Sequence, residues 1–265
     1  MVIHIALSRK LCAKINKIKT LKAFIPNLIT LLNLLMGCIG IYFAMESELI
    51  LAAYCSGLGI FLDFFDGLAA RLLKVSSELG KQLDSLADLV TSGVVPALVI
   101  FQLLSKDLVG LGSFQFSIES KSLWYAFIAF AITLGSAYRL AKFNIDENQT
   151  DKFIGLPTPA NAILILSLPF ILKYENIDWL NRLILNDIFL ISLSLMSVVL
   201  LNMKVELFSL KLKSFIYKEN KVVFLFLVVS TVMLVWLQFI AVPLIILFYI
   251  LVSILNKKNT AKTIS

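Results

Sequence analysis

The stretch Phe61-Leu62-Asp63-Phe64-Phe65-Asp66-Gly67-Leu68-Ala69-Ala70-Arg71, which leads on to Gly80-Lys81-Gln82-Leu83-Asp84-Ser85-Leu86-Ala87-Asp88, decides how this chain folds. It places four acidic residues in apolar surroundings. Asp63 and Asp66 are three residues apart, and Asp84 and Asp88 are four apart. Both spacings put a pair of carboxylates on one face of an α-helix. We therefore expect two antiparallel helices, joined by a short polar turn, whose acidic pairs face each other.

Four carboxylates that converge in an apolar environment need compensation. Each buried charge is costly, and like charges oppose one another's ionisation. A pair of hard cations would remove both costs, and ligands that are all oxygen favour Mg²⁺ or Mn²⁺. Asp63, Asp66, Asp84 and Asp88 are therefore the candidate metal ligands, and two such ions suit phosphoryl chemistry. Gly67 would let a ligand approach the backbone, and Arg71, one helical turn further on, could pair with a phosphate.

Two other interpretations of the acidic residues remain open. In the first, the four aspartates form salt bridges between helices, but only Arg71 and Lys81 are plausible partners for four acids. In the second, they mark the ion pathway of a cation or proton transporter, because carboxylates within a membrane also serve that role.

Composition predicts the fold class. The 265 residues are 59% hydrophobic and 15% charged, with a mean hydropathy of +0.91, whereas soluble domains carry roughly 25% charge. The apolar runs are long and continuous rather than alternating, so strands are unexpected. We predict an all-α polytopic membrane protein. Its eight apolar segments lie approximately at residues 26–45, 49–73, 83–105, 122–143, 158–173, 187–202, 222–237 and 240–256.

The distribution of basic residues predicts the orientation in the membrane. With the N-terminus in the cytoplasm, all but four of the 24 Lys and Arg residues fall on the cytoplasmic side, as the positive-inside rule requires. We expect both termini and the active site to face the cytoplasm, in the cell membrane. The net charge of +7 thus comes from basic residues that flank the membrane spans, and we expect no nucleic-acid partner. The N-terminus lacks the features of a cleavable signal peptide, and one histidine, His4, cannot build a zinc site.

The acidic stretch resembles the signature of the CDP-alcohol phosphatidyltransferase family. The pattern D-x2-D-G-x2-A-R-x8-G-x3-D-x3-D is matched at every fixed position. The positions are Asp63, Asp66, Gly67, Ala70, Arg71, Gly80, Asp84 and Asp88. The resemblance implies a core of six transmembrane helices, usually a homodimer, with a polar cavity open to the cytoplasm. Here two further transmembrane helices would follow that core.

The resemblance also implies roles for individual residues. Asp63, Asp66 and Asp84 match the ligands of one divalent ion, and Asp63, Asp84 and Asp88 match those of a second. Asp88 matches the general base, which takes the proton from the incoming hydroxyl before attack on the β-phosphorus of CDP-diacylglycerol. The positions that match contacts to the CDP-lipid are Asn27, Thr30, Gly67, Arg71 and Ser77. Asn27 and Thr30 follow Pro26, so capping of a helix that begins there is an alternative role for them.

The acceptor alcohol is indicated by more local features. Residues 24–33, 80–90, 138–144 and 153–160 resemble the members of the family that use L-serine. Serine carries a carboxylate and an ammonium group, so its site needs a cation near the acids. Arg139, Lys142 and Asn144, at the cytoplasmic end of the fourth segment, are the candidates, with ordinary flanking charge as the alternative. Glycerol-3-phosphate or an inositol phosphate would bring a second phosphate and should require more basic residues.

The chain divides into three parts on this interpretation. Residues 1–22 form a basic cytoplasmic segment, residues 23–215 the catalytic core, and residues 216–265 a transmembrane hairpin with a basic tail.

Overall fold

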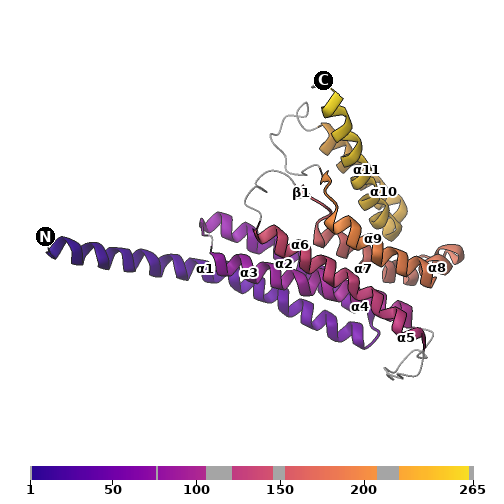
Figure 1. Ribbon diagram of the computed structural model, residues 1–265, viewed down its shortest axis with the longest axis horizontal. Helices are drawn as coiled ribbons and strands as arrows, with labels where there is room; N and C mark the ends of the chain where they lie inside the picture. Colours follow the sequence, from indigo (N-terminus) through magenta and orange to yellow (C-terminus); the bar gives the residue numbers. More distant parts are fainter. Residues whose placement is uncertain (1, 76, 106–120, 146–152, 208–220, 263–265) are drawn as a thin grey trace.

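The fold of the chain is known from a computed structural model and consists almost entirely of helices (Figure 1). It describes the backbone of residues 2–75, 77–105, 121–145, 153–207 and 221–262. Side chains are described for residues 22–75, 77–105, 124–145, 155–205 and 223–255. The first half contains α1 (Val2–Met45), α2 (Leu49–Leu73), α3 (Glu78–Asp88), a π-helical turn (Leu89–Val94), α4 (Val95–Ser105), α5 (Lys121–Ala126), a 3₁₀ turn (Phe127–Phe130) and α6 (Ala131–Ile145). The second contains β1 (Phe153–Ile154), α7 (Thr158–Tyr174), α8 (Asp178–Ile184), α9 (Asp187–Asn202), β2 (Glu206–Leu207), α10 (Lys221–Leu237) and α11 (Ala241–Lys262).

All eight predicted apolar segments are helical, and the prediction of an all-α membrane protein is confirmed. Fewer than eight helices, however, are both long enough and apolar enough to cross a membrane. Five helices in the described part of the chain could cross a membrane, or six if the bent pair α8 and α9 forms one span. The difference arises because α7 has only 17 residues and because residues 223–255 count as one apolar stretch.

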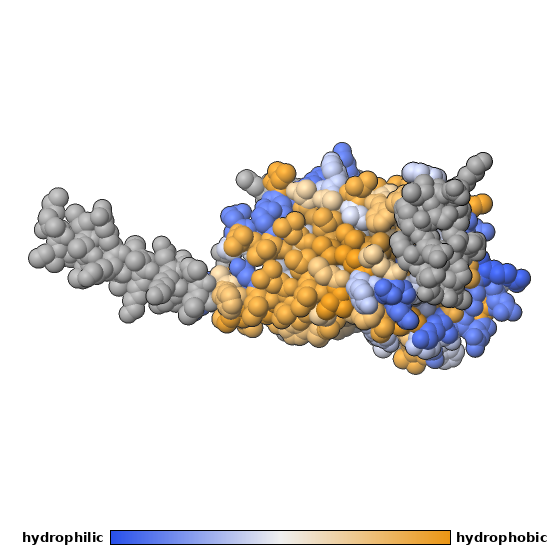
Figure 2. Space-filling view, turned by 90° about the horizontal axis from the view of Figure 1, so that it is seen from below, coloured by the Kyte–Doolittle hydropathy of each residue, from blue (hydrophilic) through white to orange (hydrophobic). Residues whose placement is uncertain are grey.

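The outer surface of the bundle is apolar, whereas its interior contains polar side chains. Figure 2 shows a continuous hydrophobic surface along the body of the molecule. Leu72, Leu134 and Ile188 are more than two-thirds exposed, and Asn33 and Ser136 are fully buried. Such an extended apolar surface is what a bilayer, and not water, would cover.

Pro26 does not begin a helix, so the expectation that Asn27 and Thr30 follow a helix start is wrong. Helix α1 passes through Pro26 without interruption. A proline inside a helix removes one backbone donor and leaves the carbonyl four residues earlier unpaired. Membrane helices tolerate this loss. Asn27 and Thr30 therefore lie in the interior of α1, where they cap nothing.

The central helix of the bundle changes its pitch just after Asp88. The π-helical turn Leu89–Val94 joins α3 to α4 into one apolar stretch of 28 residues. Its backbone carbonyls are bound from both sides, because Ser56 on α2 donates to the carbonyl of Thr91 (2.7 Å) and Thr133 on α6 donates to that of Gly93 (3.1 Å). Local π-helical geometry is frequent at functional sites, and here it occurs next to an acidic residue.

A two-residue antiparallel ladder, which the sequence analysis did not anticipate, joins the segment before α7 to the segment after α9. β1 pairs with β2 in the register Phe153↔Leu207 and Ile154↔Glu206. Gly155 continues this junction with a φ of +75°, and a Cβ there would lie 2.4 Å from the carbonyl oxygen of Leu201. Only glycine combines this backbone conformation with such close packing.

The chain reverses direction between α10 and α11. The rings of Phe226 and Phe248 stack with centroids 5.8 Å apart, although 22 residues separate them. The turn between the two helices packs on the core, since Phe239 stacks on Phe170 (5.1 Å) and on Tyr174 (5.4 Å) of α7. The stretch 223–255 is therefore a helical hairpin attached to α7 through its turn.

Two glycines of α2 provide a test of packing against the polar interior. A Cβ at Gly59 would lie 2.7 Å from Cγ2 of Thr91 and 2.8 Å from Oδ1 of Asn33, whereas a Cβ at Gly57 would meet no atom within 4 Å. We expect Gly59→Ala to lower the stability by about 1–3 kcal/mol, as overpacking does, and Gly57→Ala to be neutral or mildly stabilising. Thermal unfolding of the two variants in detergent measures the difference, and equal melting temperatures would contradict the packing.

Candidate functional site

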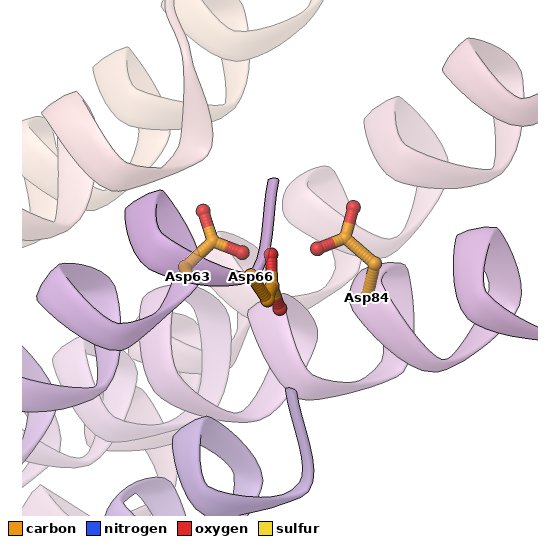
Figure 3. A group of neighbouring side chains, drawn as sticks. All are labelled: Asp63, Asp66 and Asp84. Atoms are coloured by element: carbon orange, nitrogen blue, oxygen red, sulfur yellow. The ribbon is translucent and has the colours of Figure 1, made fainter. Parts of the chain in front are cut away.

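Three aspartates from two helices converge at one end of the bundle. Asp63 and Asp66 on α2 and Asp84 on α3 each offer a carboxylate oxygen, and these oxygens all lie within 4.8 Å of one another. Figure 3 shows the three side chains directed into a common space between the helices. The expectation that the two acidic helices face each other is thus met for these three residues, with α1 packed alongside α3.

Asp88 is a buried aspartate that lies outside the three-residue cluster. It is 8% exposed and belongs to the end of α3, one turn beyond Asp84. Its carboxyl interacts with those of Asp63 and Asp84 and with the side chain of Asn33. Its Oδ1 atom is buried and has no hydrogen-bond partner among the described residues. Asp63 and Asp84, two members of the three-residue cluster, therefore connect it to Asp88.

A cavity of about 590 Å³ opens beside the aspartates. Its walls come from α1, α2 and the start of α3. The lining residues are Ala23, Pro26, Asn27, Thr30, Asp63, Phe64, Asp66, Gly67, Ala70, Arg71, Val75, Ser77, Gly80, Lys81 and Asp84. All five residues expected to contact a CDP-lipid are therefore placed around one cavity, together with three of the four aspartates.

Helix α1 holds two of these residues against the cavity. The hydroxyl of Thr30 donates a hydrogen bond to Oδ2 of Asp66 and lies 3.0 Å from the carbonyl oxygen of Pro26. The side chain of Asn27 packs on Gly80, where a Cβ would come within 3.0 Å of its Oδ1 atom. Thr30 thus orients one carboxylate, and the missing side chain of Gly80 leaves room for Asn27.

The turn between α2 and α3 shapes the mouth of the cavity. Ser77 is the N-cap of α3, and its hydroxyl accepts a hydrogen bond from the amide of Gly80 (3.0 Å). This role is structural, yet the same residue lines the cavity. Nε of Arg71 donates to the carbonyl of Gly67 (3.0 Å), so its guanidinium is held at the cavity wall.

Lys81 and Asn144 connect α3 to the end of α6. Nζ of Lys81 donates to the backbone carbonyl of Asn144 (2.7 Å). The side-chain amide of Asn144 donates to Ser85 (2.9 Å) and lies 3.3 Å from Oε1 of Gln82. Lys81 and Arg71 thus bind backbone carbonyls, and the acidic cluster is not explained by salt bridges to them.

The three candidate acceptor residues occupy different positions. Arg139 is half-buried on α6 and close enough to Asp88 for their charges to attract. Lys142 is exposed. Asn144 is engaged with α3, as described above. Of the three, Arg139 is the one with a charge interaction to an aspartate of the site.

Asn33 is a site residue that the sequence analysis missed. It is fully buried on α1, beside Asp88. The available signal was its position, because an asparagine within an apolar membrane helix is costly and marks a function. It also lies one turn after Thr30, on the same face of α1.

The residues present fit a divalent cation. Three clustered carboxylates and the buried Asp88 supply only oxygen atoms. Neither of the basic residues that line the cavity pairs with a carboxylate. A hard cation satisfies both the charge and the lone pairs of such a group. Asp63, Asp66 and Asp84 could therefore hold a metal ion.

The fold and the site together define a class of protein: a helical integral membrane protein with a carboxylate site, suited to a divalent cation, at one end of its bundle. Comparison with known families is more specific. The sequence model of the CDP-alcohol phosphatidyltransferase family matches residues 23–200 of this chain. This range includes α2, α3 and every aspartate of the site. The chain belongs to the CDP-alcohol phosphatidyltransferase family.

Similar curated proteins share one name. The CDP-diacylglycerol–serine O-phosphatidyltransferase of Bacillus subtilis is 33% identical over 147 residues, which are 56% of this chain and 76% of that protein. The enzyme of the same name from Helicobacter pylori J99 is 34% identical over 143 residues, 53% of this chain and 55% of that protein. The one from Saccharomyces cerevisiae is 35% identical over 135 residues, 46% of this chain and 44% of that protein. The chain thus spans about three quarters of the first relative and about half of the other two.

Proposed function

We propose that this protein transfers the phosphatidyl group of CDP-diacylglycerol to L-serine and releases CMP. The observation that carries the proposal is the cavity in which the family's signature residues surround three clustered aspartates. The choice of serine rests on the shared name of the relatives and on Arg139, the cation that interacts with Asp88 among the described residues. An acceptor with its own phosphate would call for more basic side chains.

The donor would bind in the cavity. Asn27, Thr30 and Ser77 offer hydrogen-bonding groups to the nucleotide, and Arg71 offers a guanidinium to its phosphates. The N-terminal end of α3 borders the same space, and helix N-termini favour anions. Asp63, Asp66, Asp84 and Asp88 would hold one or two Mg²⁺ or Mn²⁺ ions, which when bound neutralise phosphate oxygens and the leaving group.

The acceptor would be activated by Asp88. Its unpartnered Oδ1 is available to take the proton of the serine hydroxyl as that oxygen attacks the β-phosphorus. Arg139 would hold the serine carboxylate with two hydrogen bonds. Lys142 and Asn144 would act from the rim of the site, Asn144 by holding α6 on α3.

We further propose an orientation, an oligomeric state and a division of the chain. The excess of Lys and Arg on one side favours a cytoplasmic active site and cytoplasmic termini, in the cell membrane. The family resemblance favours a homodimer. Residues 23–215 would form the catalytic core, preceded by a basic segment at 1–22 and followed by the hairpin and tail at 216–265.

An acceptor panel tests the proposal. Purified protein with labelled CDP-diacylglycerol and Mg²⁺ or Mn²⁺ should release CMP with L-serine, and not with glycerol-3-phosphate or inositol phosphate. CMP release with another acceptor would refute the choice of serine. Metal-dependent cation flux in liposomes without CMP release would instead support a transporter.

Gly67→Ala separates the binding role of this glycine from a packing role. A Cβ at Gly67 would approach only Nη2 of Arg71, at 4.0 Å, so the fold has room for it. We expect unchanged thermal stability and roughly 10- to 100-fold weaker use of CDP-diacylglycerol, because the methyl group displaces the lipid's phosphates from the cavity wall. Gly57→Ala, on the same helix, is the control. A Gly67→Ala variant with unaltered KM for the donor would show that no ligand approaches this backbone.

A further inference from the structure

A group of buried polar atoms behind the acidic cluster lacks partners within the protein. They come from α1, the end of α3 with the π-helical turn, and α6. Among the described residues, no hydrogen bond is made by either side-chain polar atom of Asn33, by Oδ1 of Asp88, by Oγ of Ser92 or Ser136, or by Nε of Arg139. Asn33, Ser92 and Ser136 are fully buried.

Several other buried hydroxyls of the described residues bond within their own helix, although Ser197 and Ser230 do not. Ser105, Ser194 and Thr91 each donate to the carbonyl four residues earlier in their own helix, at 2.7, 2.9 and 3.0 Å. This is the usual way in which a membrane helix satisfies a hydroxyl. Ser92 and Ser136 do not use it, so their donors stay available to something else.

The unpartnered groups are neighbours. Asn33 on α1 and Arg139 on α6 both interact with Asp88. Ser136 packs against the turn that follows Asp88, because a Cβ at Gly93 would lie 3.2 Å from the Cβ of Ser136 and 3.5 Å from its Oγ. Ser136 and Arg139 are three residues apart and share a face of α6.

We propose that Asn33, Ser136 and Arg139, together with Asp88, form the binding site for the acceptor alcohol, and that this site is selective for a small zwitterion. The inference rests on the proposed function and assigns the acceptor half of it. Arg139 binds a carboxylate, the carbonyl oxygen of Asn33 accepts from an ammonium group, and Ser136 supplies a neutral hydrogen bond. The hydroxyl of the acceptor is then left to face Asp88.

The position of this site relative to the cavity suits a reaction between two substrates. None of Asn33, Asp88, Ser136 and Arg139 lines the cavity that would hold the donor. Asp63 connects the two regions, since it lines the cavity and also interacts with Asp88. The acceptor would thus reach the phosphorus of the donor from outside the donor cavity, and an in-line displacement requires its hydroxyl oxygen to attack opposite the departing CMP oxygen.

The charge at this site argues against a phosphorylated acceptor. Arg139 is the basic residue that interacts with Asp88 in the described part of the chain. Lys81 is held by the carbonyl of Asn144, and Lys142 is exposed. One guanidinium balances one carboxylate, whereas a phosphate monoester carries about two charges at neutral pH.

Steady-state kinetics of four variants tests the site. CMP release is measured with the full-length protein while serine and CDP-diacylglycerol are varied separately. We expect Arg139→Leu to raise the KM for serine by ~10- to 100-fold, and Ser136→Ala by ~3- to 10-fold, with donor KM within about twofold of wild type. Arg139→Lys should recover part of the loss, because it keeps the charge without the planar fork. Ser194→Ala, a buried serine with a helix partner, is the matched control.

The outcomes separate the site from the reaction. An unchanged serine KM in Arg139→Leu and Ser136→Ala, or an equal change in Ser194→Ala, overturns the site while the wild-type activity stands. If the wild type releases CMP only with another acceptor, the choice of serine fails. The variants are then tested on that acceptor, and an unchanged KM for it overturns the site as well. Binding of radiolabelled serine to wild type and Arg139→Leu in the absence of donor gives a readout independent of turnover, and equal binding overturns the site.

Discussion

Asp88→Asn is expected to lower turnover by ~10²- to 10⁴-fold, the usual contribution of general acid–base catalysis, while the affinity for CDP-diacylglycerol stays near that of the wild type. An amide cannot accept the proton of the attacking hydroxyl. Donor binding should persist because Asp88 does not line the cavity, and the three clustered aspartates that do remain in place.

Two measurements check this expectation. Single-turnover release of CMP reports the chemical step, and equilibrium binding of a labelled CDP-lipid reports the donor site. Asp187→Asn is the control, because Asp187 accepts a hydrogen bond from Tyr125 (2.9 Å) and lies outside the cavity. A variant at Asp88 that turns over within about tenfold of wild type would remove this residue from the role of base.

The sequence was sufficient to predict the membrane helices and the cluster of aspartates. Long apolar runs predict membrane helices from solvent physics alone. The spacing of Asp63 and Asp66 on one helix, and of Asp84 on the next, left few other ways for the carboxylates to be arranged. The structure places these three within 4.8 Å of one another. Both features depend on contacts that are local in sequence or separated by one short turn.

Contacts between helices far apart in sequence could not be predicted in the same way. Nothing in the spacing shows that Asn33 lies beside Asp88, or that Ser136 packs on Gly93, because each pair depends on how α1 and α6 rotate against the central helix. Asn144 illustrates the same limit. Its position near Arg139 suggested a substrate contact, whereas its side chain binds Ser85 on α3.

Local rules also failed where the membrane relaxes them. Proline usually marks the start of a helix, yet α1 continues through Pro26, since a lost backbone hydrogen bond is tolerated in a packed membrane helix. The ladder between β1 and β2 was missed because two residues carry no periodic pattern. The signal that could have predicted it is Gly155, whose conformation places the chain against Leu201.

Asp63→Asn is expected to have a different effect from Asp88→Asn, with loss of both metal and donor binding. Asp63 interacts with Asp84, Asp66 and Asp88, and on the family resemblance it would be a ligand of both ions. We expect its replacement to weaken Mn²⁺ binding by more than the ~10- to 100-fold seen when a residue outside the ligand shell of a metal is lost. The affinity for the CDP-lipid should fall together with the affinity for Mn²⁺, because the phosphates of the lipid would then face less positive charge.

The stability of the same variant should move in the opposite direction. Without metal, Asp63→Asn removes one of several like charges that repel one another at short distance. Its melting temperature in chelator is therefore expected to equal or exceed that of the wild type, and added Mn²⁺ should raise the wild-type value more. Residues kept for function commonly cost stability in this way.

Binding assays on the two variants decide whether Asp63 and Asp88 both serve donor binding or whether Asp63 alone does. Mn²⁺ titration and CDP-lipid binding are measured for wild type, Asp63→Asn and Asp88→Asn under the same conditions. If donor affinity falls equally in both variants, Asp88 serves the donor as much as Asp63 does, and its assignment as the base is wrong. If it falls only in Asp63→Asn, the carboxylate that borders the cavity organises the donor, and the buried one beside Asn33 and Arg139 is left to act on the acceptor.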